Sequence, residues 1–390
     1  MKILMINVAC GIGSTGRICT DLAEALESRG HQVKIAYGRK VVLEEHQKYA
    51  IKIGTELDVM LHGVKARLLD GMGLGSTNAT KKFIEWVKEY DPDVIHLHNI
   101  HGYYINVKVL FDYLRTCGKK IIWTLHDCWS FTGHCPHFEY VECGKWKKGC
   151  DKCQQKTEYP ARIGPDFSKR NYDLKKRLFT NIDNMVLVTP SNWLKELVGE
   201  SFLKEYETVV INNGIDTKVF KPVSSDIKKR LGCENKKVVL GVASIWSKRK
   251  GLTYLIELSK KLSSEYQVVI VGLKPNQLAE LPEGMIGIER TNSVKELAEL
   301  YSCAEVYVNT TLEDNYPTTN LEAIACGTPV ITFETGGSPE SAKMYGKVVP
   351  RGDVDAVAKA VLEVKNLKKN DFYIDYTYML EKYLKLYGEV

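Results

Sequence analysis

Residues 304–334 read AEVYVNTTLEDNYPTTNLEAIACGTPVITFE. Two short apolar runs, at 304–310 and 328–334, enclose a polar loop and a helical pattern, NLEAIACG, at 320–327. Short apolar strands that alternate with helices predict a parallel sheet covered on both faces. The stretch is therefore one strand–helix–strand unit of an α/β domain.

The same alternation runs in both directions from this unit. It begins again near residue 237 in the second half, and strand patterns in the first half start at Lys2 and recur up to Thr189. Between the halves lies INNGIDTKVFKPVSSD, at 211–226, which has the composition of a linker. A chain of 390 residues is long enough for two domains.

We therefore expect an α/β protein built from two tandem Rossmann-like, doubly wound domains. The predicted N-terminal domain spans 1–218 and the C-terminal domain 219–375, while a helix over 376–390 packs back on the first domain. Ligands of such sheets bind beyond the carboxyl ends of the strands, which predicts a functional cleft between the domains.

The charge of the chain is concentrated in one segment. The sequence has 54 Lys and Arg against 48 Asp and Glu, a net charge of +6. Residues 141–177, the basic segment, hold 11 of the cations and 5 of the acids, which accounts for the whole surplus. This segment lies in a cysteine-rich insert, at about 128–177, that we expect within the N-terminal domain.

Composition also sets expectations about location. No run approaches the 18 or more apolar residues that a bilayer-spanning helix needs, and the first residues do not resemble a signal peptide. Eleven cysteines without an export signal favour a reducing compartment. We expect a cytoplasmic protein, or one that lies peripherally on the inner face of the cell membrane.

A glycine-rich loop, Gly11–Gly16 (GIGSTG), follows the first strand and opens a helix. Such glycines let backbone N–H groups approach an anion at the helix N-terminus. A dinucleotide site would also place an acid at the end of the second strand, but Arg39 follows there. Three interpretations stay open: an NADP-dependent oxidoreductase, a tight packing turn, or a loop that meets substrate or phosphate.

Acids and histidines near strand ends are weighed one by one. Asp91-Pro92-Asp93 and Asp353-Val354-Asp355 look like a metal motif, but their positions favour turns and helix caps, so we predict no catalytic metal there. His126 ends a strand, where it would face a cleft, and we expect it to be functional. His96 lies inside a strand, and we expect a core residue.

The loop within 304–334 contains two acids, Asp314 and Glu322, on either side of a helix start. Together with the donors of Asn315, Thr318 and Thr319 they would suit a ligand rich in hydroxyl groups, such as a sugar nucleotide. The alternative is a capping acid and a solvated Glu. In WSKRKG, at 246–251, Arg249 and Lys250 precede a helix and suggest a diphosphate site, or merely a solvated charge run.

Four cysteines fall within the insert. Cys135, Cys143, Cys150 and Cys153 end in a CxxC pair, and His134 and His137 lie beside them. A structural zinc site, a set of reduced thiols and a disulfide are the three interpretations. The basic residues and aromatics nearby favour an anionic membrane surface over nucleic acid, for which no base-reading element is evident.

These motifs together resemble the retaining family-4 glycosyltransferases of the GT-B fold. The matching text is Lys250-Gly251, then Asp314 and Glu322 continuing through LEAIACGTPVITFETGGSPE at 321–340, and NGID at 213–216. In the first half the matches are the glycine-rich loop, LAEALESRGHQV, PDVIHLH and TLHD. Within the family the chain is most similar to enzymes of bacterial capsule, exopolysaccharide or lipopolysaccharide assembly, including the colanic-acid type.

The resemblance implies transfer of a hexose-type sugar from a UDP- or GDP-sugar to a saccharide or lipid-linked saccharide, with retention of configuration and no catalytic cofactor. It implies that His126, Asp314 and Glu322 are catalytic-site residues. Glu322 would bind ribose, Asp314 the donor sugar, and His126 the sugar near its reacting carbon. The implied donor-binding residues are Gly13, Gly16, Arg249, Lys250, Asn315, Tyr316, Thr318 and Thr319.

Three positions depart from the family pattern. Asp314 stands where a Glu is usual, Ser244 where an Arg is usual, and Pro317 where a Gly is usual. A proline has no N–H to give to a ligand. These departures bear on the identity of the donor more than on the class of reaction.

Overall fold

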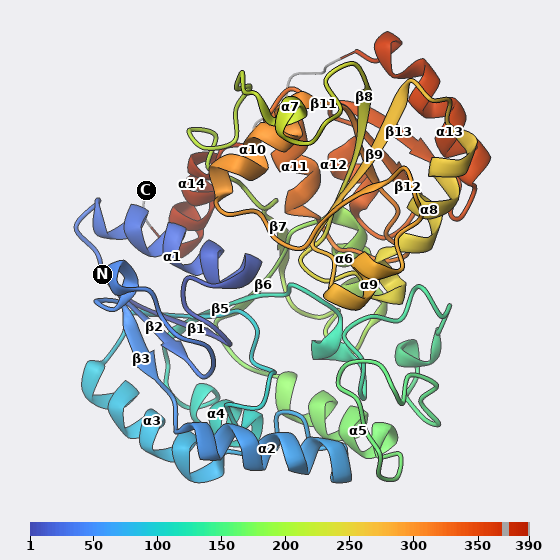
Figure 1. The fold of residues 1–390 in the computed structure, drawn as a ribbon. Helices are drawn as coiled ribbons and strands as arrows, with labels where there is room; N and C mark the ends of the chain where they lie inside the picture. The colour runs from blue at the N-terminus through green and yellow to red at the C-terminus, as the bar shows by residue number, and fades with distance from the viewer. Residues whose placement is uncertain (369–373, 389–390) are drawn as a thin grey trace. The chain divides into compact units, whose positions relative to one another are not determined.

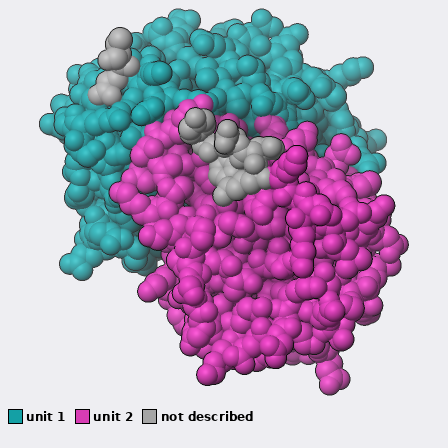
Figure 2. Space-filling model, turned by 90° about the horizontal axis from the view of Figure 1, so that it is seen from above, with its two compact units in different colours: residues 1–211, 380–390 teal, residues 212–379 magenta. Residues whose placement is uncertain are grey.

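The computed structural model describes residues 1–368 and 374–388, and its contacts divide the chain into two compact units. Unit 1 comprises Met1–Ile211 together with the chain from Leu380 onward, and unit 2 comprises Asn212–Met379. Figure 1 shows the elements and Figure 2 colours the two units. The division falls after Ile211, at the start of the predicted linker 211–226. The sequence analysis placed this boundary at residue 218.

Within the described residues, unit 1 contains a seven-stranded sheet in the order β3-β2-β1-β4-β5-β6-β7, in which every neighbouring pair is parallel. The strands are β1 (Lys2–Asn7), β2 (Gln32–Tyr37), β3 (Ala50–Lys52), β4 (Val94–Leu97), β5 (Lys120–Thr124), β6 (Met185–Thr189) and β7 (Thr208–Val210). The α-helices are α1 (Gly13–Glu27), α2 (Glu56–Leu69), α3 (Thr77–Tyr90), α4 (Val107–Leu114), α5 (Ser168–Phe179) and α6 (Asn192–Glu200).

In the described part of unit 2 a six-stranded parallel sheet has the order β10-β9-β8-β11-β12-β13. Its strands are β8 (Lys237–Val242), β9 (Tyr266–Val271), β10 (Ile286–Ile288), β11 (Ala304–Asn309), β12 (Val330–Phe333) and β13 (Gly346–Val349). The α-helices are α7 (Ile227–Arg230), α8 (Leu252–Lys261), α9 (Pro275–Ala279), α10 (Val294–Cys303), α11 (Thr318–Ala325), α12 (Ser338–Ala342) and α13 (Val354–Glu363).

Burial explains why these segments form strands. The central strands of both sheets are apolar on both faces, and β4 and β12 are buried at every residue. Such runs occur where helices cover both faces of a parallel sheet. The covering helices are amphipathic; in α4, for example, Val107, Leu110, Phe111 and Leu114 are buried. The predicted fold class, two doubly wound α/β domains, is confirmed.

The strand orders fix where ligands bind in each unit. In unit 1 the chain direction across the sheet reverses between β1 and β4, and in unit 2 between β8 and β11. Ligands of open α/β sheets bind beyond the carboxyl ends of the strands at such a switch point. The loops that follow these four strands are therefore the first places to look for a site.

The C-terminal helix α14 (Tyr376–Tyr387) extends from unit 2 into unit 1. In unit 1 the hydroxyl of Tyr387 lies 2.7 Å from His96 Nδ1, and that of Tyr383 lies 2.9 Å from Thr124 Oγ1. Both tyrosines are buried. Residues 389–390 of the helix expected over 376–390 lie outside the described residues. Across the described ranges, no helix is both long and apolar enough to cross a bilayer.

Candidate active site

Two loops meet at the switch point of unit 2. The loop after β8 ends in a 3-10 turn, η4 (Lys248–Lys250), and the loop after β11 contains Asp314. Lys250 Nζ forms an ion pair with Asp314 Oδ2, and Arg249 Nη1 lies 4.0 Å from the same oxygen. Burial lowers the pKa of Lys250, and the charge of Asp314 opposes that shift. Two cations thus share one carboxylate, so the cluster has positive charge available for an anion.

Gly251 determines where these cations lie. It adopts a φ of 72°, and a side-chain carbon at this position would come within 2.2 Å of the Thr310 carbonyl oxygen. The hydroxyl of Thr310 donates to the Gly251 carbonyl at 2.9 Å, and the N–H of Leu312 donates to the Arg249 carbonyl at 2.7 Å. The two loops are therefore held together by their backbones as well as by the ion pair.

The backbone around Asp314 is supported from the other side by a glycine pair. The N–H of Gly337 donates to the Asp314 carbonyl at 3.0 Å. Gly336 has a φ of 56°, and a side-chain carbon there would lie 2.0 Å from that carbonyl oxygen. These contacts explain the glycine at 336, because only glycine allows so close an approach in the left-handed region.

Glu322 lies on α11, one turn inside the helix, and is 6% exposed. Its Oε2 accepts a hydrogen bond from the Tyr301 hydroxyl at 3.0 Å. Burial, followed by the charge of Glu322, raises the pKa of Tyr301 well above its usual range, so the hydroxyl stays a donor. The prediction that Glu322 lies in the first turns of a helix and Asp314 in the loop before it is confirmed.

A buried polar network fixes α11 against its neighbours. Asn320 accepts from Asn309 Nδ2 at 2.9 Å and donates to the hydroxyls of Ser338 and Ser341 at 3.1 and 2.9 Å. Ser338 in turn shares a hydrogen bond with Thr332 at 2.8 Å. A network with every member paired is rigid. It therefore holds the helix that carries Glu322 in one orientation.

The remaining residues predicted at this site surround the start of α11. Asn315 and Tyr316 are buried in the loop, and the Tyr316 carbonyl accepts from Asn213 Nδ2 at 3.1 Å. Thr318 and Thr319 form the first turn, after Pro317. Pro317, the residue before α11, makes no side-chain capping hydrogen bond. The first N–H groups of α11 therefore belong to the same loop cluster as Asp314 and Lys250.

In unit 1 the glycine-rich loop joins β1 to α1, as predicted. Gly11 and Gly13 have φ values of 72° and 76°, and the Gly11 N–H donates to the Gly16 carbonyl at 3.1 Å. A side-chain carbon on Gly16 would lie 3.3 Å from the Ala9 carbonyl. Arg39 Nη1 is 3.5 Å from the Gly102 carbonyl and stacks over Tyr103. The loop is thus a tight, backbone-lined turn at the unit 1 switch point.

Histidines and an aspartate lie in the loops that follow β4 and β5 of the same sheet. His98 Nδ1 lies 3.0 Å from His126 Nε2, and His101 Nε2 lies 2.8 Å from Asp127 Oδ2. Burial lowers the pKa of His126 to about 4, partly offset by the charge of Asp127. His98 has a lowered pKa for the same first reason. Both imidazoles are therefore neutral at pH 7.

His96 is a core residue, as expected. It is fully buried, and its Nδ1 and Nε2 lie 2.7 and 2.8 Å from the hydroxyls of Tyr387 and Thr124. The sequence analysis predicted no metal at the two Asp-x-Asp motifs, and an aspartate of each has a structural role instead. Asp353 caps α13 by accepting from the Ala356 N–H, and Asp93 accepts from the Lys2 N–H.

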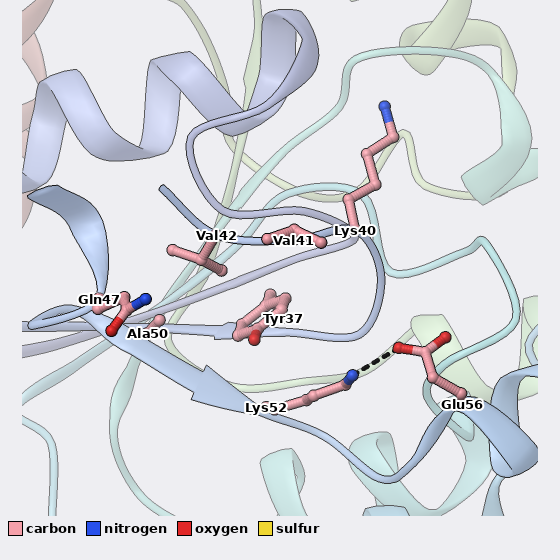
Figure 3. A pocket seen from close by; sticks show the side chains of 8 residues that line it. All are labelled: Tyr37, Lys40, Val41, Val42, Gln47, Ala50, Lys52 and Glu56. Atoms are coloured by element: carbon pink, nitrogen blue, oxygen red, sulfur yellow. Dashed lines mark hydrogen bonds and ion pairs between the residues drawn. The ribbon is translucent and has the colours of Figure 1, made fainter. Parts of the chain in front are cut away.

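A hollow of about 660 Å³ opens beside the end of β2. Figure 3 shows that Lys52 and Glu56 interact at its floor while Lys40 extends away from the other side chains. Lys40 has a φ of 71°, and its Nζ lies toward Gly13. The hollow is lined by Tyr37, Lys40, Val41, Val42, Gln47, Ala50, Lys52 and Glu56.

The four cysteines of the insert line one small cavity, together with His134. All are thiols rather than disulfides. A hydrogen bond with Cys135 lowers the pKa of Cys153 to about 6, whereas burial raises that of Cys150 to about 11. Across 1–368 and 374–388, no three His, Cys, Asp or Glu side chains stand in an arrangement that could hold a metal ion.

Two buried ionisable groups lie at this cavity: Lys175, which was not predicted from the sequence, and His134, which the sequence analysis named only as a neighbour of the cysteines. Lys175 donates to the carbonyls of Trp129 and Thr132 at 2.6 and 3.0 Å, and burial lowers its pKa to about 7. His134 Nδ1 lies 2.5 Å from Asp70 Oδ1, while its Nε2 is buried without a partner. Lys175 lies on the buried face of α5 with Tyr172 and Leu178, and that helical spacing was the available signal.

Comparison with known proteins places these features in one family. Residues 15–219 match the sequence profile of "Glycosyltransferase Family 4", and residues 236–366 match "Glycosyl transferases group 1". A glycosyl transferase of Escherichia coli (strain K12), WcaC, whose name assigns it provisionally to colanic acid biosynthesis, is 25% identical over 91% of this chain and 88% of its own.

Solved structures of low sequence identity share the fold. Sucrose-phosphate synthase of Thermosynechococcus elongatus superposes with a TM-score of 0.70 at 18% identity, over 99% of this chain and 98% of its own. HepE of Anabaena, solved in complex with UDP, gives a TM-score of 0.69 at 16% identity over the full length of both chains.

Proposed function

The chain belongs to glycosyltransferase family 4, a family of retaining enzymes with the GT-B fold, and from that premise we propose its substrates and the roles of its residues. The donor is a nucleotide-activated hexose, with UDP or GDP as the nucleotide. The acceptor is a saccharide or lipid-linked saccharide, and the product belongs to a bacterial surface polysaccharide, as the name of the Escherichia coli relative suggests.

The observation that carries this proposal is the ion pair of Lys250 and Asp314 at the unit 2 switch point. Without a ligand, Asp314 neutralises one of the two adjacent cations. When a donor binds, its diphosphate would take Lys250 and Arg249, and Asp314 would turn to the hydroxyls of the donor sugar. Glu322, held by Tyr301, would accept from the ribose hydroxyls. Asn315, Tyr316, Thr318 and Thr319 would line the donor between these two carboxylates.

The same groups account for the chemistry. Negative charge develops on the diphosphate as the bond to the sugar breaks, and fixed cations and backbone N–H groups stabilise it there. Lys250, Arg249 and the first turn of α11 would supply this stabilisation from unit 2. Gly13 and Gly16 would supply backbone N–H groups from unit 1. Retention then follows if the acceptor oxygen attacks on the face that the leaving phosphate occupied: its bond to the sugar carbon forms as the bond to the diphosphate breaks, and its proton passes to the departing phosphate.

His126 would contact the donor sugar near its reacting carbon, and a neutral side chain suits that role. A neutral imidazole at pH 7 can donate one hydrogen bond and accept another, and so can bind a sugar hydroxyl without a net charge. The hollow lined by Tyr37 and Lys40 is our candidate acceptor pocket because the Lys40 side chain, which lines it, extends to Gly13 of the glycine-rich loop. The oxidoreductase alternative rested on the glycine-rich loop alone, and membership of a glycosyltransferase family gives it no support.

Catalysis needs no metal or other cofactor under this proposal. A zinc ion held by Cys135, Cys143, Cys150 and Cys153 would be structural, and it would require the thiols to turn into their shared cavity. Metal analysis of protein purified without chelator tests it. About one zinc per chain, lost in Cys150→Ser, supports the site, and a ratio near zero overturns it.

The enzyme would act in the cytoplasm and on the inner face of the cell membrane. The basic segment, 141–177, would contact anionic lipid headgroups there, and nucleic acid is not a partner. Lys145, Lys147 and Lys169 are among its exposed cations. A lipid-linked acceptor would be reached from this position.

A thermal-shift panel of UDP-, GDP- and ADP-sugars against NADPH tests the proposed donor class. One nucleotide sugar should raise the melting temperature by a few degrees at saturating concentration, because a ligand that binds only the folded state stabilises it. Glu257→Gln, an exposed change on α8, serves as the control and should respond as wild type does. A shift with NADPH alone would overturn the proposal.

A further inference from the structure

The helix α2 exposes a continuous apolar face. Leu57, Met60 and Leu61 are each 58% exposed, and Val64 and Leu68 are 49% and 46% exposed. Their spacing of three and four residues places them on one side of the helix. We name these five residues the α2 apolar face. Scattered single apolar residues are ordinary on a protein surface, whereas a contiguous group indicates an interaction surface.

The orientation of α2 is fixed, so this face cannot turn inward. The opposite side carries His62 and Ala66, which are buried. His62 Nε2 accepts from the N–H groups of Gly73 and Gly75 at 3.1 and 3.0 Å, and its Nδ1 lies 3.0 Å from Ser76 Oγ. A capping box between Thr55 and Asp58 fixes the start of the helix. The side of the helix with His62 and Ala66 therefore packs within unit 1, whereas the α2 apolar face remains exposed.

The apolar face continues onto the basic insert. The N–H groups of Ile163 and Gly164 donate to the Arg67 carbonyl at 2.9 and 3.2 Å, and the Ile163 side chain is 69% exposed. Arg170, at the start of α5, donates to the Leu69 carbonyl at 3.1 Å. Figure 1 shows α2 and α5 at the outer surface of unit 1.

The charges beside the face select its partner. Lys65, Arg67, Lys169 and Arg170 are exposed around it, and Lys169 and Arg170 belong to the segment that carries the whole net charge of the chain. Helices that lie in a membrane interface combine exposed Leu and Met with flanking Lys and Arg. Each such cation near an anionic surface adds to the attraction.

We propose that the α2 apolar face inserts into the interface of an anionic lipid bilayer, with the basic insert on the headgroups beside it. This inference rests on the proposed function, in which the acceptor is lipid-linked. It adds the element that enters the membrane, whereas the basic segment alone would bind only by charge. Shallow insertion would bring the enzyme to its acceptor without a membrane-spanning helix.

Co-sedimentation of the full chain with lipid vesicles tests this inference. Wild type should bind vesicles of phosphatidylcholine with 30% phosphatidylglycerol at least tenfold more tightly than pure phosphatidylcholine. The triple variant Leu57→Ser, Leu61→Ser, Leu68→Ser should lose at least tenfold of that binding, and Lys169→Glu should weaken it several-fold. Leu362→Ser, which removes a leucine that is 65% exposed on α13, is the matched control and should bind as wild type does.

Two further measurements distinguish a failure of this inference from a failure of the proposed function. Hydrolysis of the nucleotide sugar in detergent-free solution should be the same in wild type and the triple variant, which shows that the variant is folded. If hydrolysis is absent in both, the proposed function fails; if hydrolysis is present but the triple variant binds vesicles as wild type does, this inference fails. It also fails if wild type does not bind, or if gel filtration shows a dimer that the triple variant abolishes without any vesicle binding.

Discussion

Glu322 is a buried carboxylate whose Oε2 accepts a hydrogen bond from the Tyr301 hydroxyl.

 The carboxylate lies on a helix that a paired polar network holds in place, and under the proposed function it would accept hydrogen bonds from ligand hydroxyl groups. Replacing it with Gln removes the charge and one acceptor oxygen, and no residue of that network is changed. The effects of single residues at this site are therefore separable from effects on folding.

Glu322→Gln should lower kcat/KM for the donor about 100-fold or more, because ribose hydroxyls would lose a charged acceptor. The melting temperature should fall by only a few degrees. Steady-state kinetics of wild type, Glu322→Gln and the exposed control Glu257→Gln test this. Activity in Glu322→Gln within threefold of wild type would reject the ribose role.

Lys250 should matter through its charge. Lys250→Met keeps the length of the side chain but removes the cation, and we expect kcat to fall about 100- to 1,000-fold because charge develops on the leaving diphosphate. Lys248→Met, a change two residues earlier in the same η4 segment, should have a much smaller effect. Equal losses in the two variants would show that general charge, not a specific contact, is responsible.

His96 predicts a pH dependence of stability. Burial lowers its pKa to about 3, whereas in the unfolded chain it protonates near 6.5. Between these values the unfolded state binds more protons, so the free energy of unfolding falls as the pH drops from about 6.5 toward 3. The loss is on the order of a few kcal/mol. Urea titrations at pH 7, 5.5 and 4.5 should show a shallower loss in His96→Gln, and parallel losses in both proteins would contradict this assignment.

At the scale of elements, the joint between η4 and α8 depends on one glycine. Gly251→Ala would place a carbon against the Thr310 carbonyl in a backbone region that disfavours side chains, so we expect a loss of about 2–4 kcal/mol in stability and weaker donor binding. Gly232→Ala has a similar φ of 66° but open space around it, and should cost only about 1 kcal/mol. Denaturant titration compares the two, and equal losses would mean that the close approach to Thr310 is unimportant.

Elements differ in how well the sequence predicts them. The central strands β1, β4, β8 and β11 are apolar runs followed by recognisable loops, and the sequence analysis found them all. The short edge strands β3, β7 and β10 have three residues each, too few for a periodic pattern, and were not predicted. The helix α2 was also missed, because apolar residues on two sides of it hide the 3.6-residue period.

The site was predictable in part for a similar reason. Asp314, Glu322, Arg249 and Lys250 lie in loops and helix starts next to strong strand patterns, so the strand order brings them to one edge. The ion pair between Lys250 and Asp314 was not predictable, because a contact across 64 residues depends on the tertiary fold. The same holds for His134 with Asp70, and for Lys175 beneath the cysteine cluster.

At the scale of the whole molecule, the described chain contains two parallel sheets, and the order of the six strands in unit 2 repeats that of the first six in unit 1. Cations and carboxylates follow β8 and β11 in unit 2, and glycines and neutral histidines follow β1, β4 and β5 in unit 1. The surplus positive charge belongs to an insert of unit 1 and not to the loops after β8 and β11. Under the proposed function, charge thus serves two purposes: donor binding in unit 2 and membrane contact in unit 1.

The most direct test of the central claim is the release of nucleoside diphosphate from a panel of UDP- and GDP-sugars, measured in the presence of EDTA. We predict that wild type releases the diphosphate from at least one donor, and that Glu322→Gln and Lys250→Met lower that rate about 100-fold or more while Glu257→Gln does not. Release from no donor by folded wild-type protein, or release that both site variants retain in full, would contradict the account.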